Sequence, residues 1–361
     1  MKFNDKQVSL FKGRKISLEV FGASHAKEIG VTAKGFKGER FDAQKLQEFM
    51  DRRKPKNTAY STKRKEGDVP TFTRGEKNGV LKNKFRAVIV NSDQRSADYK
   101  NVEKTPRPSH ADFVAWTKYG DGFDYRGGGK FSGRLTAPIC IAGGIAKQVL
   151  ENKGIKIDAY ILSIGNKEGK GIADVKSIEE SLSMIDKDFP VLDKTSEKPM
   201  MEEIESARQD CDSVGGVIEC VIRGVPVGAG EYMFDSLESV ISELIFAVPA
   251  VKGIEFGSGF ALSKMRGSQA NDSFYYDEDG LVKTKTNHNG GINGGMANGM
   301  PITFRVVIKP TPSIAKEQDT VDLKTKTNVK LKIVGRHDAC IVPRAVPVIE
   351  AVSALAIYDS I

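Results

Sequence analysis

Apolar side chains recur along this chain with two different periods, and this feature constrains the fold more than any other. Within residues 235–248 they recur every three or four positions, as on one face of an amphipathic helix. Asp235 and Glu238 resemble a capping box at its start, and Pro249 follows its end. Residues 302–308 instead alternate polar and apolar side chains, which is typical of a half-buried strand. The chain is therefore expected to combine helices and strands.

Further elements follow from the same two patterns. Three more runs rich in β-branched residues are expected to be strands: Val31–Phe36, Phe85–Val90 and Val217–Arg223. Two more helices are expected, one after Asp42 that ends before Pro55 and one over Pro138–Leu150. Strands and helices do not alternate with the regularity of a doubly wound sheet, and no fixed-period repeat occurs. We therefore predict a layered α+β arrangement rather than a Rossmann domain.

The number of domains is not fixed by length, because 361 residues with 39% hydrophobic content can build one large core or two ordinary ones. Asn166–Glu203 and Ala315–Val329 are rich in charged residues and Ser, and we interpret them as exposed connections or solvated helices. Glycine-bearing polar motifs occur on both sides of these segments. This distribution favours one site assembled by a single domain spanning residues 1–361.

Composition also bears on the compartment. No apolar run approaches the roughly 20 residues that span a bilayer, and Met1–Lys15 is polar and charged, unlike a signal peptide. The four cysteines are far apart in sequence and form no CxxC pair, so we expect reduced thiols rather than a disulfide framework. These features predict a soluble, cytoplasmic protein without a membrane partner.

The chain is basic, with a formal net charge of +8 and a pI near 9.1. Such a charge suits anionic ligands, from nucleic acid to small phosphates. A nucleic-acid-binding protein could use the basic run that includes Arg52, Arg53, Lys54 and Lys56. Aromatic residues do not interleave with this run as stacking platforms would, so we expect no nucleic-acid partner.

The four histidines all lie among small, polar or charged residues, where a proton donor has access to ligands. His25 follows Ser24, which can orient its ring, although an ordinary turn between strands is the alternative. His110 lies between Arg107 and Asp112, and Asp112 could either orient the ring or cap the next helix.

The strongest signal for an anion site is the segment 125–134, Tyr-Arg-Gly-Gly-Gly-Lys-Phe-Ser-Gly-Arg, which leads into a helix. Arg126, Lys130 and Arg134 would surround a phosphate or carboxylate, whereas a flexible glycine loop is the alternative. The segment is neither a Walker loop nor a dinucleotide fingerprint. A second glycine cluster, at residues 290–299, could fit against a flat ring.

Residues 335–338, Gly-Arg-His-Asp, place a cation, an imidazole and a carboxylate side by side. A surface salt bridge is the default interpretation of such a group. Metal binding is conceivable as well, but no HxxxH, HExxH or paired-carboxylate spacing supports it, so we expect no metal.

Taken together, the motifs resemble those of the chorismate synthase family in order and spacing. They comprise Gly-x-Ser-His at residues 22–25, Arg-Arg-x-Pro at 52–55, Asn-Ser-Asp-Gln-Arg-Ser at 91–96, Arg-Pro-x-His-Ala-Asp at 107–112, Tyr-Arg-Gly-Gly-Gly at 125–129, Gly-Gly-Ile-x-Gly-Gly at 290–295, Lys-Pro-Thr at 309–311 and Gly-Arg-His-Asp at 335–338. One such motif would be weak evidence, whereas eight in the family's order are not accidental.

This resemblance implies an enzyme of β-α-β sandwich fold that assembles as a homotetramer. It implies a lyase that converts 5-enolpyruvylshikimate-3-phosphate to chorismate and phosphate by 1,4-elimination, the last common step of aromatic amino-acid biosynthesis in the shikimate pathway. It also implies reduced FMN as cofactor, with an external reductant such as NADPH. A divergent paralogue that acts on a related phosphorylated acid and an FMN oxidoreductase are the alternatives.

The resemblance also assigns roles to residues. His25 would protonate the departing phosphate, His110 would stabilise the reduced flavin, and Asp338 would accept a proton through flavin N5. Arg53 and Arg134 would bind the substrate. The implied flavin contacts are Lys130, Phe131, Ser132, Pro249, Ala250, Gly294, Lys309, Pro310, Thr311, Pro312, Ser313 and Arg336.

Some positions depart from the usual family pattern. Ala23 and Ala26 flank the first motif histidine where the family has an acid and a glycine, and Lys56 and Ala59 follow the Arg-Arg-x-Pro segment in place of a glycine and an arginine. Leu135 replaces a common acidic residue, and Phe131 replaces a small one.

Overall fold

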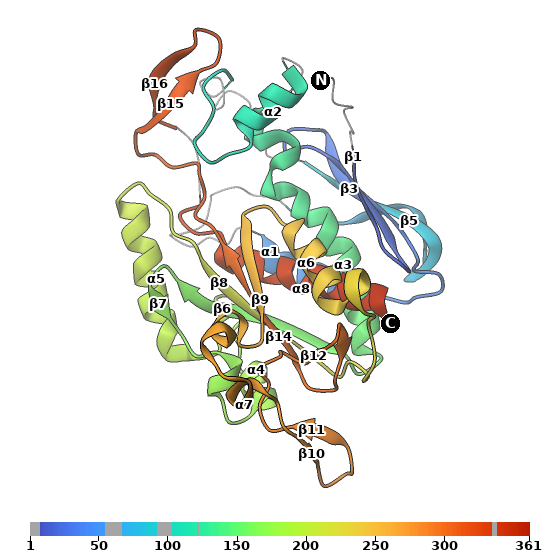
Figure 1. Ribbon diagram of the computed structural model, residues 1–361. Helices are drawn as coiled ribbons and strands as arrows, with labels where there is room; N and C mark the ends of the chain where they lie inside the picture. Colours follow the sequence, from blue (N-terminus) through green and yellow to red (C-terminus); the bar gives the residue numbers. More distant parts are fainter. Residues whose placement is uncertain (1–7, 55–66, 92–102, 121–122, 334–337) are drawn as a thin grey trace.

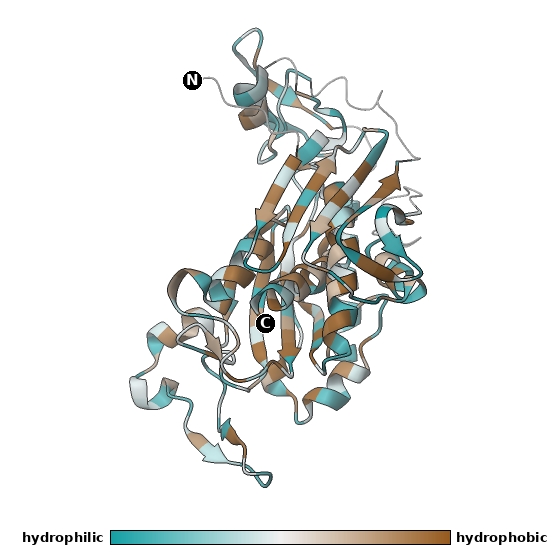
Figure 2. Cartoon of the chain, turned by 90° about the vertical axis from the view of Figure 1, so that its right-hand side faces the viewer, coloured by the Kyte–Doolittle hydropathy of each residue, from teal (hydrophilic) through white to brown (hydrophobic). Residues whose placement is uncertain are grey.

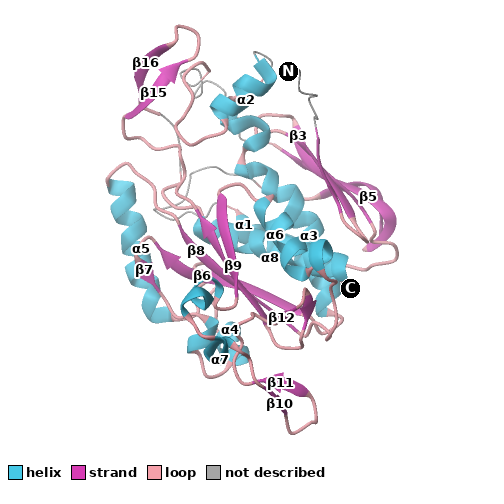
Figure 3. Ribbon diagram, in the orientation of Figure 1, coloured by secondary structure: helices cyan, strands magenta, loops and turns pink. Residues whose placement is uncertain are grey.

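The computed structural model describes residues 8–54, 67–91, 103–120, 123–333 and 338–361. In these ranges, two five-stranded antiparallel sheets enclose a layer of helices (Figures 1 and 3). The first sheet has the order β1-β2-β3-β5-β4. Its strands are β1 (Val8–Lys12), β2 (Ser17–Gly22), β3 (Glu28–Lys34), β4 (Thr71–Lys77) and β5 (Val80–Val90).

The second sheet has the order β7-β6-β8-β14-β9. Its strands are β6 (Lys156–Ile164), β7 (Lys167–Glu168), β8 (Gly216–Arg223), β9 (Val251–Phe256) and β14 (Ile302–Ile308). Two small hairpins extend from this half of the molecule, β10 (Phe274–Tyr276) with β11 (Val282–Thr284) and β12 (Ile292–Asn293) with β13 (Met296–Ala297) (Figure 1). A third hairpin, β15 (Gln318–Asp322) with β16 (Thr327–Leu331), lies at the other end of the molecule, where Thr320 Oγ1 donates to the Pro106 carbonyl at 2.6 Å.

Four helices form the middle layer, namely α1 (Ala43–Arg53), α3 (Thr136–Glu151), α6 (Leu237–Phe246) and α8 (Val342–Ser360). The shorter α2 (Asp112–Tyr119) lies near the N-terminal end of α3 (Figure 1). The remaining helices lie around the second sheet, namely α4 (Ile178–Ser183), α5 (Lys194–Gln209) and α7 (Gly267–Ala270). The predicted α+β class and sandwich arrangement are confirmed. Among the described residues, no helix has both the length and the apolar character needed to cross a bilayer.

Helix α8 lies at the centre of the helical layer and contacts α1, α3 and α6 as well as β6 and β8. Its side chains from Val346 to Asp359 are buried on every face, as expected for a helix that is apolar all round. The buried carboxylate of Asp359 accepts hydrogen bonds from the backbone N–H groups of residues 14–16, at 2.8–3.0 Å. These bonds tie the end of α8 to the first sheet.

One cluster of buried apolar side chains joins the two sheets through the helices. It includes Val31 of β3, Ile141 of α3, Leu355 of α8, Ile218 of β8 and Phe304 of β14. Figure 2 shows hydrophobic residues distributed along the strands and helices of the interior. The loops at the ends of these elements therefore stand on a common, closely packed support.

Most predicted elements are confirmed with small changes in length. Asp42 caps α1 by accepting hydrogen bonds from Gln44 N and Lys45 N, at 2.8 and 3.1 Å. The strand predicted at residues 302–308 is β14 without change. The capping box at Asp235 was wrong, because that residue belongs to a short 3-10 turn and Ser236 caps α6.

The two charged segments differ in outcome. Asn166–Glu203 does contain the solvated helices α4 and α5, although it also buries Phe189 and Met200. Ala315–Val329 was expected to be a connection or a helix and instead includes most of the β15–β16 hairpin. Each strand carries a Thr and a Val, residues that favour strands, and the surrounding charges hid this signal.

Candidate active site

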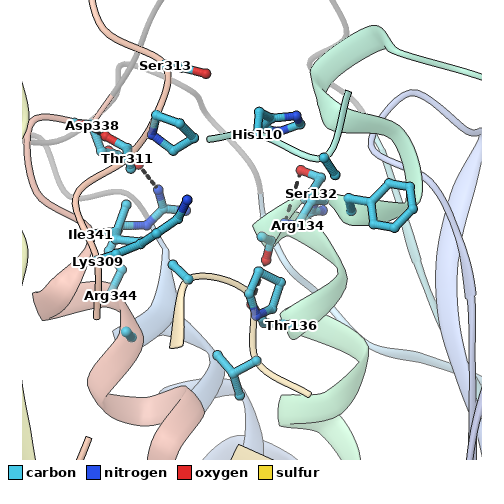
Figure 4. Close-up of a pocket in the computed structure, with 18 of the residues that line it drawn as sticks. His110, Ser132, Arg134, Thr136, Lys309, Thr311, Ser313, Asp338, Ile341 and Arg344 are labelled. Carbon is cyan, nitrogen blue, oxygen red and sulfur yellow. Dashed lines mark hydrogen bonds and ion pairs between the residues drawn. The ribbon is translucent and has the colours of Figure 1, made fainter. Parts of the chain in front are cut away.

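A cavity of about 580 Å³ opens where several segments of the chain meet. On one side lie His110 and residues 127–136, at the start of α3; on the other lie residues 309–313 after β14 and the first turn of α8 (Figure 4). The C-terminal end of α6, residues 246–250, completes the wall. The glycine motif and the loops that follow β14 and α6 thus meet at one cavity, although they are far apart in sequence.

The glycine motif begins with Gly127, Gly128 and Gly129, whose φ values of 58°, 84° and 54° are left-handed. Only glycine adopts three such conformations in succession at little cost. Glycine is also required because neighbouring side chains approach these residues too closely to leave room for a Cβ. A Cβ on Gly127 would lie 2.5 Å from Ser24 Oγ and 2.9 Å from His25 Nε2, and one on Gly128 would lie 3.2 Å from His110 Nε2. The loop therefore passes beside both predicted catalytic histidines.

His25 lies in the turn between β2 and β3 and is 6% exposed. Its turn is joined to the glycine motif by a hydrogen bond from Ser24 N to the Gly129 carbonyl, at 3.0 Å. His25 does not line the cavity itself, but it lies beside Gly127, which does. The expected orientation of the ring by Ser24 is absent, since Ser24 Oγ has no hydrogen-bond partner in the described parts of the chain.

His110 lines the cavity, and Asp112 orients its ring. Its Nδ1 is 2.6 Å from Asp112 Oδ1, and Arg107 donates to the same carboxylate through Nε at 2.7 Å and Nη2 at 2.8 Å. Burial by itself would raise the pKa of Asp112, but the hydrogen bonds from Arg107 and His110 outweigh it and hold this pKa well below its usual value. A carboxylate only accepts, so we assign the ring proton to Nδ1.

The two roles considered for Asp112 are thereby resolved. The position before α2 is occupied by Ala111, which makes no side-chain capping bond, so Asp112 orients the imidazole rather than caps the helix. The backbone beside His110 is strained, because Ser109 has a φ of 59°. The Ser109 carbonyl accepts a hydrogen bond from Lys309 Nζ at 2.7 Å, across the cavity wall.

Cations predominate among the charged side chains of the lining. Arg53 and Arg134 both pair with the buried carboxylate of Asp68, and Arg344 pairs with Asp338 at 2.5 Å. Lys309 is partly buried, and this desolvation together with the charge of Lys252 lowers its pKa. The cationic residues that line the cavity are Arg53, Arg107, Lys130, Arg134, Lys309 and Arg344.

A model of the family described as chorismate synthase matches residues 16–361 of this chain. The protein named chorismate synthase of Thermococcus kodakarensis is 45% identical over 350 residues, which cover 96% of both chains. The chain belongs to the chorismate synthase family. The proteins of the same name from Pyrococcus abyssi and Dehalococcoides mccartyi are 44% and 41% identical, over 96% of this chain and 96% and 95% of theirs.

The fold agrees with this membership. A crystal structure titled chorismate synthase superimposes with a TM-score of 0.70 and 22% identity, covering 97% of this chain and 92% of that one. The predicted family and the predicted enzyme class are confirmed by these comparisons.

The cavity of this member of the chorismate synthase family brings together most of the residues that its motifs had marked. Those that line it are Arg53, His110, Lys130, Phe131, Ser132, Arg134, Pro249, Ala250, Lys309, Thr311, Pro312, Ser313 and Asp338. Pro310 lies between two lining residues without lining the cavity itself. Arg336, Lys56 and Ala59 lie outside the described residues, as do His337 and most of the motif at residues 91–96.

Two expectations disagree with the geometry. Gly294 lies in the turn between β12 and β13, next to Gly295. The Gly295 carbonyl accepts a hydrogen bond from Leu237 N, at the N-terminal end of α6. The cavity lies at the C-terminal end of that helix, so Gly294 does not line it. Arg126 does not line the cavity and forms an ion pair with Asp124 at 2.8 Å. The second glycine cluster therefore packs elsewhere, and of the three cations in residues 125–134, Lys130 and Arg134 line the cavity while Arg126 does not.

Sequence reasoning missed Asp68 and Arg344. Asp68 lies two residues beyond a long charged stretch and has no motif-like neighbours. The sequence position of Arg344 could have predicted its role, because a cation in the first turn of a long apolar helix is unfavourable next to the helix dipole and needs a nearby anion. Asp338 supplies that anion.

Proposed function

We propose that the chain converts 5-enolpyruvylshikimate-3-phosphate to chorismate and phosphate by a 1,4-elimination that requires reduced FMN. The observation that carries the proposal is the charge of the cavity: among the described residues, six cationic side chains line it, against the one carboxylate of Asp338. A substrate with one phosphate and two carboxylates needs several cations, and planar guanidinium groups suit these anions best. Family membership supports the same substrate.

The residues present fit a flavin. Phe131, Pro249 and Ala250 offer apolar surface for a flat ring, and Lys130 and Lys309 offer charge for a phosphate. The backbone at Gly133 is open to the cavity, since a Cβ there would have no atom within 4 Å. When bound, reduced FMN supplies electron density to the reaction without net oxidation.

The chain's own residues then donate and accept the protons of the reaction. His25 donates a proton to the departing phosphate, from a position fixed against the glycine motif. His110, whose Nδ1 is held by Asp112, presents Nε2 beside Gly128 and stabilises negative charge on the cofactor. Asp338, paired with Arg344, receives the proton that leaves the substrate. General acid–base groups of this kind contribute about 10²–10⁴ in rate each.

Further parts of the proposal concern the whole chain. We propose a single domain, supported by the core shared between both sheets. We propose a cytoplasmic location, supported by four cysteines without disulfide partners, of which Cys140, Cys220 and Cys340 are buried. The homotetramer and an external reductant such as NADPH are proposed on family membership.

Anaerobic phosphate release tests the proposed function. With reduced FMN, the protein should release phosphate from 5-enolpyruvylshikimate-3-phosphate without consuming reductant, and oxidised FMN alone should not support release. Stoichiometric oxidation of the flavin during turnover would instead identify an oxidoreductase. Turnover of another phosphorylated acid, with none of this substrate, would identify a divergent paralogue.

The assigned roles are tested by substitution. His25→Ala, His110→Ala and Asp338→Asn should each lower kcat by more than about tenfold while the folded state survives. Far-UV circular dichroism and thermal unfolding provide the control for folding. Wild-type turnover in all three variants would refute the assignment.

A further inference from the structure

We propose that Asp68 is a positioning residue that holds Arg53 and Arg134 in the geometry needed to bind the anionic groups of the substrate. The inference rests on the proposed function, since it concerns the same cavity. Asp68 itself does not line the cavity and lies behind the two arginines, so it acts through them.

The contacts of Asp68 join two distant parts of the chain. Oδ2 accepts from Arg53 at the end of α1, and Oδ1 accepts from Arg134 in the turn before α3. The side chains of both arginines are 3% exposed, and that of Asp68 is fully buried. One carboxylate therefore fixes the separation of two guanidinium groups that come from different helices.

Weaker contacts complete the arrangement. Arg53 Nη1 donates to Thr136 Oγ1 at 3.3 Å, and Arg134 Nε donates to Asn91 Oδ1 at 3.1 Å. Thr136 begins α3 and lines the same cavity (Figure 4). These neutral acceptors set the tilt of each guanidinium group, but neither acceptor touches both groups. In the described parts of the chain, the carboxylate of Asp68 contacts both guanidinium groups and couples them.

The charges explain why a carboxylate is required here. Two guanidinium groups held close together in a buried site repel each other, and bringing each out of water is costly. Burial would raise the pKa of Asp68, but the charges of Arg53 and Arg134 outweigh it and keep this pKa below its usual value. Within this trio one negative charge offsets only half of the positive charge.

The backbone gives a second sign that Asp68 is held in place. Its φ of 43° lies in the left-handed region, which aspartate tolerates better than most residues but at a cost. Backbone strain of this kind persists where surrounding contacts fix the residue, and it is common at ligand sites. Here the two ion pairs are the contacts that fix it.

The chain supplies a matched control in Glu350 of α8. This carboxylate is also buried and also bridges two cations: Arg52, which donates two hydrogen bonds at 2.6 and 2.7 Å, and Lys147, at 3.8 Å. Arg52 is the neighbour of Arg53 on α1, but neither it nor Glu350 lines the cavity. Glu350 thus has the same chemistry as Asp68 without a route to the substrate.

The experiment compares Asp68→Asn with Glu350→Gln in the flavin-loaded enzyme. Both substitutions should lower the thermal stability, because each leaves buried cations with less compensation. Only Asp68→Asn should raise KM for 5-enolpyruvylshikimate-3-phosphate, by at least about tenfold, with a smaller change in kcat. Binding of the same substrate to flavin-free protein, measured by calorimetry, should weaken to the same extent. Flavin affinity should be unchanged in both variants.

The outcomes separate this inference from the proposed function. If the wild type does not release phosphate from this substrate, the proposed function fails, and calorimetric titration of flavin-free protein with inorganic phosphate still tests Asp68. Equal KM and equal anion affinity in Asp68→Asn and the wild type would overturn the inference, as would equal losses in Glu350→Gln. If Asp68→Asn does not fold, Asp68→Glu keeps the charge and shifts the guanidinium groups by one methylene. An unchanged KM in that variant would also overturn it.

Discussion

Replacing Gly127 by alanine should disable the site through two separable effects. The first is backbone strain, because Gly127 has a φ of 58° and left-handed residues other than glycine cost about 1–2 kcal/mol. The second is a steric clash, because the new Cβ would lie 2.5 Å from Ser24 Oγ and 2.9 Å from His25 Nε2. Both neighbours are almost fully buried, so neither moves without disturbing the turn between β2 and β3.

Gly38→Ala separates the two effects. Gly38 also has a left-handed φ, 81°, but a Cβ there would have no atom within 4 Å, and the residue is remote from the cavity. This variant should therefore lose only the strain energy of about 1–2 kcal/mol and keep full activity. Gly127→Ala should lose more stability than Gly38→Ala. It should also lose about 100-fold in kcat, since a displacement of about 1 Å at a catalytic group has that effect.

Denaturant unfolding measures the stability of both variants, and anaerobic phosphate release measures kcat. The two variants should differ in kcat as well as in stability. A Gly127→Ala variant that is as stable as Gly38→Ala and has the kcat of the wild type would refute the placement of His25 against the glycine motif.

Two further predictions follow from the buried carboxylates. Asp112→Asn should lower kcat by about tenfold or more, because the amide no longer fixes the proton on Nδ1 of His110; a pH–rate profile identical to that of the wild type would contradict this role. The pKa values of Asp68 and Asp112 are held low in the folded state despite burial, by their arginine partners. Their contribution to stability should therefore be complete above about pH 4 and be lost as the pH falls through the lowered pKa values. Thermal unfolding followed from pH 7 to pH 2 checks this, and a Tm that stays constant below pH 4 would argue against it.

Local sequence patterns predicted the elements well where one face is buried and the ends carry a strong signal. The helix α1 is an example, since Asp42 caps it and Leu46, Phe49 and Met50 form its buried face. Prediction was poorer where competing signals lie close together. Asp235 and Ser236 are both good capping residues, and only the path of the preceding 3-10 turn selects Ser236.

The site was predicted in part for a similar reason. Glycine runs, histidines among small residues and clustered cations identify His110, Lys130 and Arg134 without knowledge of the fold. Asp68 has no such local mark, because its role depends on two partners that the chain brings to it. Gly294 does not line the cavity, and its left-handed turn shows that a glycine-rich segment satisfies turn geometry as readily as it satisfies a ligand.

The sequence by itself determined the periods of the helices and strands, the excess of positive charge and the motifs that identify the family. The tertiary structure alone decided that Arg53, 81 positions before Arg134, shares a carboxylate with it, and that the end of α6 faces the start of α8 across a cavity. The physical reason is that propensity and periodicity act within a few residues. Contacts between distant residues arise only when both sheets pack against the same helices and exclude water between them.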